Sequence, residues 1–154
     1  MKDKTCCFTG HRVISIGEYE ELKQNLKDEI SSLIGKGVIY YGCGGALGFD
    51  TLCAETIIAL KPEFPQIRLI LVLPCPEQAD RWSVNDRQKY EYIKKQADKI
   101  VYTSIHYTSD CMHKRNRHLI DNSSYCICYQ RRKTGGTAYT VAYAMKKEVE
   151  LIFL

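Results

Sequence analysis

Short apolar runs alternate with amphipathic stretches along the whole chain of 154 residues. Most of these runs are continuously apolar, which is typical of strands that helices cover on both faces. Between the runs, apolar residues recur at helical spacing, as at Leu22, Leu26, Ile30 and Leu33. The pattern predicts six strands, at residues 5–9, 38–41, 67–73, 99–102, 125–129 and 149–153.

This alternation predicts one α/β domain over residues 1–154. We expect a Rossmann-like, doubly wound and mostly parallel sheet with helices on both faces. Ligands of such sheets bind at the carboxyl ends of the strands, where the strand order reverses. With the common order 3-2-1-4-5-6, the site lies near the switch between strands one and four.

The composition is that of a soluble globular protein, with 45% hydrophobic residues, 26% charged residues and a net charge of +4. No apolar run approaches the roughly 20 residues that span a bilayer. The first residues also lack the apolar core of a signal peptide, so we expect a cytoplasmic protein without a membrane segment. The mild positive charge allows an acidic ligand and does not require nucleic acid.

The chain has eight cysteines. Cys6, Cys7, Cys126 and Cys128 lie inside apolar strand runs, Cys53 lies in a helical pattern, and no CxxC pair occurs. These positions favour reduced, buried thiols over a disulfide framework, and we expect no metal site.

The first strand ends in Thr9, Gly10, His11 and Arg12. A glycine at a strand end lets backbone amides approach an anion, and the forked guanidinium of Arg12 suits a phosphate. We expect these residues to bind the ligand. The alternative is an ordinary turn with a solvated arginine.

The second strand runs into a glycine-rich loop that contains Gly44, Gly45 and Gly48 and leads through Asp50 into a helix. Glycines before a helix are typical of loops that hold phosphate on free backbone amides. The spacing matches neither the dinucleotide fingerprint nor a P-loop. The alternative is a turn in which Asp50 caps the helix.

The helix after the fourth strand has an apolar face that carries Met112 and Leu119. Helical spacing places Arg115 and Asn116 on this same inward face. A buried arginine is costly unless it meets an anion or a carboxylate. We expect Arg115 and Asn116 to contact the ligand, and a structural salt bridge from Arg115 to Asp50 is the alternative.

The fifth strand leads through three basic residues, 131–133, to Gly135, Gly136 and Thr137, and a helix follows from near Ala138. A glycine pair at a helix start again offers free amides and the positive end of the helix dipole. The basic run itself favours a solvated loop over a ligand clamp. In the long third connection, we expect Trp82 and Asn85 to cover a base or ribose, with ordinary packing as the alternative for Trp82.

With these motifs in order, the chain resembles the YpsA-like branch of the SLOG superfamily, the Smf/DprA and LOG proteins. The resemblance covers essentially the whole chain. It implies a Rossmann-like fold and a nucleotide or nucleotide-derived ligand such as ADP-ribose or NAD. The motifs that carry it are CCFTGHR at 6–12, GGALGFD at 44–50, PCPEQADRW at 74–82, CMHKRNRHLIDNSS at 111–124 and TGGTAYTVAYA at 134–144.

Two segments are similar to particular members of the superfamily. GGALGFDTLCAE resembles the glycine-rich turn of DprA proteins, which bind single-stranded DNA. TGGTAYTVAYA resembles the PGGxGTxxE loop of LOG enzymes, which split nucleoside monophosphates, and the resemblance adds Thr140 to the expected ligand-binding residues. Tyr143 stands where that loop has its glutamate, so the carboxylate that assists the departing base is missing.

The sequence therefore predicts a cytosolic domain that binds or senses a nucleotide-like ligand of the ADP-ribose, NAD or mononucleotide class. The alternative is a hydrolase that cleaves an N-glycosidic bond, with Asp50, Arg115 and Asp121 as its candidate catalytic residues. Nucleic-acid binding is a third hypothesis. We do not favour it, because the aromatic residues on which bases would stack do not alternate with the basic residues. The sequence leaves open whether any reaction is catalysed, allows a homo-oligomer and names no protein partner.

Overall fold

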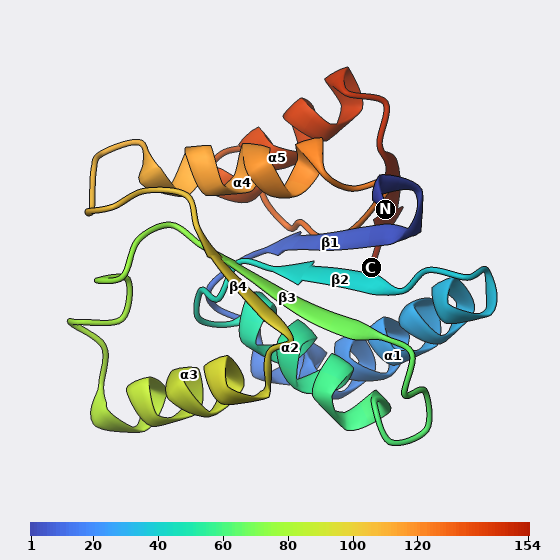
Figure 1. Ribbon diagram of the computed structural model, residues 1–154. Coiled ribbons are helices and arrows are strands. Elements are labelled where there is room, and N and C mark those ends of the chain that lie inside the picture. The colour runs from blue at the N-terminus through green and yellow to red at the C-terminus, as the bar shows by residue number, and fades with distance from the viewer.

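The six predicted apolar runs all form strands of one sheet in the computed structural model, which describes residues 1–154 (Figure 1). The sequence predicts a mostly parallel sheet, and every neighbouring pair of strands is in fact parallel. The second strand begins two residues later than the sequence pattern predicts. The strands are β1 (Thr5–Gly10), β2 (Tyr40–Cys43), β3 (Arg68–Leu73), β4 (Lys99–Tyr102), β5 (Tyr125–Tyr129) and β6 (Glu150–Phe153).

Helices cover both faces of the sheet, as predicted. One face carries α1 (Tyr19–Gly35), α2 (Phe49–Leu60) and α3 (Val84–Gln96), below the sheet in Figure 1. The other face carries α4 (Cys111–Asp121) and α5 (Gly136–Lys146). None of these helices combines the length and apolar composition that crossing a bilayer requires.

The strand order differs from the expected one. It is β4-β3-β2-β1-β5-β6, so β5 and not the fourth strand lies beside β1. The crossovers after β1, β2 and β3 run in one direction along the sheet, with α1, α2 and α3 on one face. The direction reverses at the connection from β4 through α4 to β5, and the crossover from β5 through α5 to β6 continues in the reversed direction. Because right-handed crossovers place the helix according to direction, α4 and α5 occupy the opposite face. The switch point is therefore between β1 and β5.

The core has two layers that the sheet separates. The larger holds 25 buried residues and packs α1, α2 and α3 against one face. The smaller holds nine, among them Leu119 and Ile120 of α4 and Val141 of α5. All eight cysteines are free and buried, and Cys7, Cys126 and Cys128 belong to the smaller layer. A buried free cysteine packs there as a small apolar side chain.

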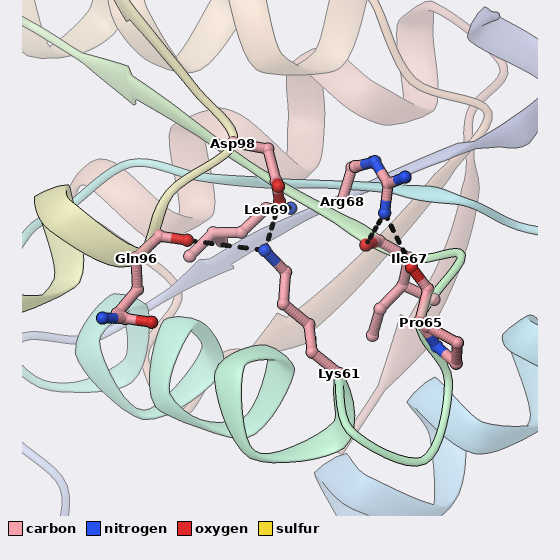
Figure 2. Close-up of polar contacts among 7 residues, drawn as sticks. All are labelled: Lys61, Pro65, Ile67, Arg68, Leu69, Gln96 and Asp98. Carbon is pink, nitrogen blue, oxygen red and sulfur yellow. Dashed lines mark hydrogen bonds and ion pairs between the residues drawn. The ribbon is translucent and has the colours of Figure 1, made fainter.

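A network of hydrogen bonds links the end of α2 to the amino ends of β3 and β4 (Figure 2). Asp98, just before β4, forms an ion pair with Lys61 at the end of α2 and accepts a 2.8 Å hydrogen bond from the Leu69 N–H. Lys61 also donates to the Gln96 carbonyl. Partial burial raises the pKa of Asp98, but these hydrogen bonds and the Lys61 charge outweigh it and lower the pKa below its ordinary value.

The network predicts an acid-sensitive contribution to stability. The lowered native pKa means that the Asp98 carboxylate stabilises the fold above its unfolded pKa of about 3.9. This contribution is lost as the pH falls through the native pKa. Asp98→Asn keeps an acceptor for Leu69 and removes the charge, so it lowers the free energy of unfolding by about 1–2 kcal/mol at pH 7.

Urea unfolding of both proteins from about pH 7 to about pH 2 measures this difference, which should vanish at the acid end. Glu63→Gln, at an exposed position without an ion pair, is the matched control. A difference that stays constant with pH would show that the Asp98 charge does not stabilise the fold.

Candidate ligand-binding site

A cavity of about 700 Å³ opens at the carboxyl ends of β1 and β5, at the switch point of the sheet. We call it the switch cavity. It contains residues from the end of β1, the start of α2, α4, the end of β5 and the start of α5. The cavity wall includes nine of the residues that the sequence analysis predicts to bind the ligand: Thr9, Gly10, His11, Arg12, Asp50, Arg115, Asn116, Gly136 and Thr137.

Arg115 is the most unusual residue of the switch cavity because its charged side chain is only 4% exposed. Its Nη1 donates to the carbonyl oxygen of Gly44, and its Nε donates to Asn116 Oδ1 at 2.7 Å. Its remaining contact is a weak one of 3.8 Å to the sulfur of Met112. No carboxylate forms an ion pair with it. The Arg115–Asp50 salt bridge, which the sequence analysis gives as the alternative to ligand binding, is therefore absent.

Gly44 makes room for this guanidinium. A Cβ at position 44 would lie 2.5 Å from Arg115 Nη1 and 2.8 Å from Asp50 Oδ2. Gly44 therefore allows the Arg115 side chain to pack against the loop. The sequence pattern predicts instead that this glycine lets a phosphate approach the loop. Gly10 has a comparable packing role, because a Cβ there would lie 2.3 Å from the ring of Phe49.

Asp50 is the buried carboxyl group nearest to Arg115. Its Oδ2 accepts a hydrogen bond of 3.2 Å from the Ala46 N–H, and its side chain lies in the first turn of α2. Burial raises the pKa of Asp50 above its ordinary value, although the Arg115 charge opposes this shift. Burial likewise lowers the pKa of Arg115, with the Asp50 charge opposing. Both charges are thus held away from water without direct contact between them.

A second network holds the rim of the switch cavity and includes residues that the sequence did not single out. Glu18 accepts hydrogen bonds from the Tyr129 hydroxyl at 2.7 Å and from Arg131 Nε at 2.8 Å. The Arg131 backbone N–H donates to His11 Nε2 at 2.7 Å. Nothing in the sequence relates Glu18 to Arg131. Only Tyr129 could have been linked to the site from the sequence, because it lies at the carboxyl end of a predicted strand.

The N-terminus of α5 faces the same cavity. Gly135, with a φ of 97°, precedes the helix, and no side chain caps it. Gly136 and Thr137 line the cavity, and the first-turn amides have no intrahelical partner. The helix begins at Gly136, two residues before the position predicted from the sequence. Thr140 does not line the cavity, because its buried hydroxyl donates to the Gly136 carbonyl at 3.0 Å.

A smaller cavity of about 270 Å³, here called the aromatic cavity, lies beside the switch cavity on the α3 side. It is lined by Trp82, Tyr19, Tyr90, Gly45 and Gly48 among others, and Asp50 lines both cavities. Trp82 packs edge-on against Tyr90 with ring centroids 5.1 Å apart. Asn85, expected beside Trp82 in the site, is exposed on α3 and lines neither cavity.

Asp121 lies outside the site. It is the last residue of α4, is exposed and accepts a 2.7 Å hydrogen bond from the Tyr143 hydroxyl. We therefore withdraw it as a catalytic candidate. The carboxylates that line the switch cavity are Asp50 and Glu18, and Glu18 is occupied by Tyr129 and Arg131. Of these two carboxylates, only Asp50 is placed to exchange a proton with a bound molecule.

The sequence profile of the YspA SLOG family matches residues 6–151. The chain belongs to this family. UPF0398 proteins of Bacillus thuringiensis (strain Al Hakam) and Bacillus cereus (strain AH187) are each 27% identical to it, over 96% of this chain and 86% of theirs. The resemblance drawn from the five sequence motifs is confirmed, and these motifs supply most of the residues of the switch cavity.

Solved structures of DNA processing protein A share the fold of this YspA SLOG family member. The Helicobacter pylori protein, reported for its single-stranded DNA binding mode, superposes with a TM-score of 0.68 at 18% identity. The Streptococcus pneumoniae protein gives 0.69 at 16% identity. Each match covers 99% of this chain, which spans 65% of the first protein and 50% of the second.

The contact between Gly44 and Arg115 can be tested by adding a single methyl group. Gly44→Ala forces the guanidinium away from the Gly44 carbonyl and should lower the free energy of unfolding by about 1–3 kcal/mol. Urea unfolding measures this change. In the control Gly35→Ala, no atom lies within 4 Å of the new Cβ, so stability should be unchanged or slightly higher. A Gly44→Ala protein as stable as the wild type would contradict the tight contact.

Proposed function

We propose that this protein binds a nucleotide-like anion, of the ADP-ribose, NAD or mononucleotide class, in the switch cavity. The observation that carries the proposal is Arg115, a buried guanidinium at the cavity wall with no carboxylate partner. An unpaired buried charge costs several kcal/mol, and a bound anion would offset this cost. Arg12, which also lines the cavity, would supply a second, exposed charge.

The arrangement of the two cavities supports a ligand with distinct parts. Phosphate fits the switch cavity, where Arg115 and the amide end of α5 lie. A base fits the aromatic cavity beside Trp82. Asp50, which lines both, would accept a hydrogen bond from a sugar hydroxyl between them.

This is a binding or sensing function, and hydrolysis is the weaker candidate. Asp50 would have to replace the LOG glutamate without help, because Tyr143 and Asp121 pair with each other outside the cavity. The proposal also places the protein in the cytoplasm, where the eight free, buried cysteines would stay reduced.

Ligand binding should stabilise the protein, and this stabilisation should depend on Arg115. ADP-ribose, NAD or AMP should raise the melting temperature, because a ligand at 100 times its Kd adds about 2.7 kcal/mol of stability. Arg115→Met should abolish this gain. Without ligand, Arg115→Met should change the free energy of unfolding little, because it removes a costly buried charge but also the hydrogen bond to the Gly44 carbonyl.

Thermal shift and urea unfolding provide the two readouts. Arg117→Met is the matched control, because Arg117 lies on the same helix and donates to the Tyr139 hydroxyl away from the cavity. A ligand-free Arg115→Met protein destabilised by about 3 kcal/mol or more, with an unaltered ligand effect, would make Arg115 structural. The absence of any shift across the three ligands would refute the proposal.

A second candidate function is binding of single-stranded DNA. The fold shared with the Helicobacter pylori protein favours it. The local chemistry opposes it, because the guanidinium of Arg131 is already engaged by Glu18 and by the Leu154 carbonyl at 2.8 Å each. Arg132 and Lys133 remain exposed at this loop.

Binding to single strands should be weak and strongly salt-dependent. Contacts made by a few exposed basic residues release counterions, so affinity for an oligonucleotide should fall steeply with salt and vanish at about 0.15 M. Fluorescence anisotropy at several salt concentrations measures this. Submicromolar binding that survives this salt and is lost in Lys133→Gln would favour the DNA function instead.

A further inference from the structure

The imidazole of His11 is held in one protonation state by its surroundings. Its Nε2 lies 2.7 Å from the backbone nitrogen of Arg131, and a backbone N–H can only donate. Nε2 is therefore the unprotonated nitrogen. In a neutral ring the proton must then be on Nδ1, which makes Nδ1–H a hydrogen-bond donor.

The partner of Nε2 is fixed by contacts from three parts of the chain. The Arg131 side chain bonds to Glu18 from the turn before α1 and to the carbonyl of Leu154 at the end of the chain. Its guanidinium also lies over the Tyr129 ring at 4.5 Å. The His11 ring packs edge-on against the same tyrosine at 5.4 Å. A flipped His11 ring would lose the hydrogen bond from the Arg131 backbone N–H.

Two donors consequently face each other at the rim of the switch cavity. Nδ1 of His11 lies 3.3 Å from Nη2 of Arg132, and both atoms carry hydrogen. The Arg132 side chain has no other hydrogen-bond partner, and His11 is only 7% exposed. Burial, followed by the charges of Arg132 and Arg131, lowers the pKa of His11, which favours the neutral ring. The pair lacks an acceptor.

We propose that His11 and Arg132 form a subsite for a phosphate oxygen of the ligand. The oxygen would accept from Nδ1–H of His11 and from the guanidinium of Arg132. Gly136 and Thr137 at the start of α5 line the same cavity and add the positive end of the helix. The inference rests on the proposed function and specifies the orientation of the ligand. Its phosphate group lies at the β5–α5 side of the cavity, and its hydroxyl-bearing part lies at Asp50.

Two substitutions separate the two nitrogens of His11. In His11→Gln the amide oxygen can replace Nε2 as acceptor, but the Nδ1–H donor is lost. In His11→Asn the amide nitrogen can replace Nδ1–H, but the acceptor for Arg131 is lost. Calorimetric titration with AMP should show a loss of affinity of about tenfold or more in His11→Gln, the effect of one hydrogen bond to a charged group. His11→Asn should recover part of this loss despite a lower melting temperature.

Adenosine separates the phosphate from the rest of the ligand, because its affinity should be the same in the wild type and in His11→Gln. AMP bound equally well by the wild type and His11→Gln would overturn the subsite while leaving the proposed function standing. Failure of the wild type to bind AMP would count against the proposed function. Binding of inorganic phosphate by the wild type and by His11→Gln would then test the subsite separately.

Nitrogen NMR of the histidines in the wild-type protein tests the subsite without any substitution. His11 should show a protonated Nδ1 and an unprotonated Nε2, and inorganic phosphate should shift the Nδ1–H signal. Assignment is simple, because the chain has four histidines. A protonated Nε2, or an Nδ1–H signal unaffected by phosphate, would overturn the proposal.

Discussion

The site depends on one buried charge that has no carboxylate within ion-pair distance. Arg115 projects from α4 to the carbonyl of Gly44, and its only other polar contacts are Asn116 and a methionine sulfur. A folded protein keeps such a group at a cost in stability. The glycine at position 44 and the buried Asp50 beside it are arranged around this guanidinium. We infer that the missing counter-charge comes from the ligand.

The reversal of the sheet brings this charge into a cavity. Because β5 and not β4 lies beside β1, the loops after β1 and β5 diverge at the switch point. The helices α4 and α5 lie on one face and α2 on the other, so Arg115, Gly136 and Asp50 approach the opening from different sides. The His11–Arg131 bond joins residues 120 positions apart across the same opening. Topology thus gathers side chains that are scattered along the sequence.

The sequence predicted the strands, the parallel sheet and the family, because buried strands and strand-end motifs leave local signals. It did not predict the strand order, since a continuously apolar run carries no information about its neighbour. It placed Arg115 on the inward face of α4 correctly, but Asp121, at the end of the same helix, faces away from the cavity. The network of Glu18, Tyr129 and Arg131 was missed because its contacts are long-range and its residue types are common on surfaces.

A crystal structure of the protein grown with ADP-ribose would show whether a bound phosphate supplies the counter-charge of Arg115. We expect a diphosphate in the switch cavity, with phosphate oxygens within hydrogen-bond distance of the Arg115 guanidinium, and the adenine directed toward Trp82. ADP-ribose bound at another surface, or a switch cavity in which Arg115 keeps only its contacts to Gly44 and Asn116, would contradict it.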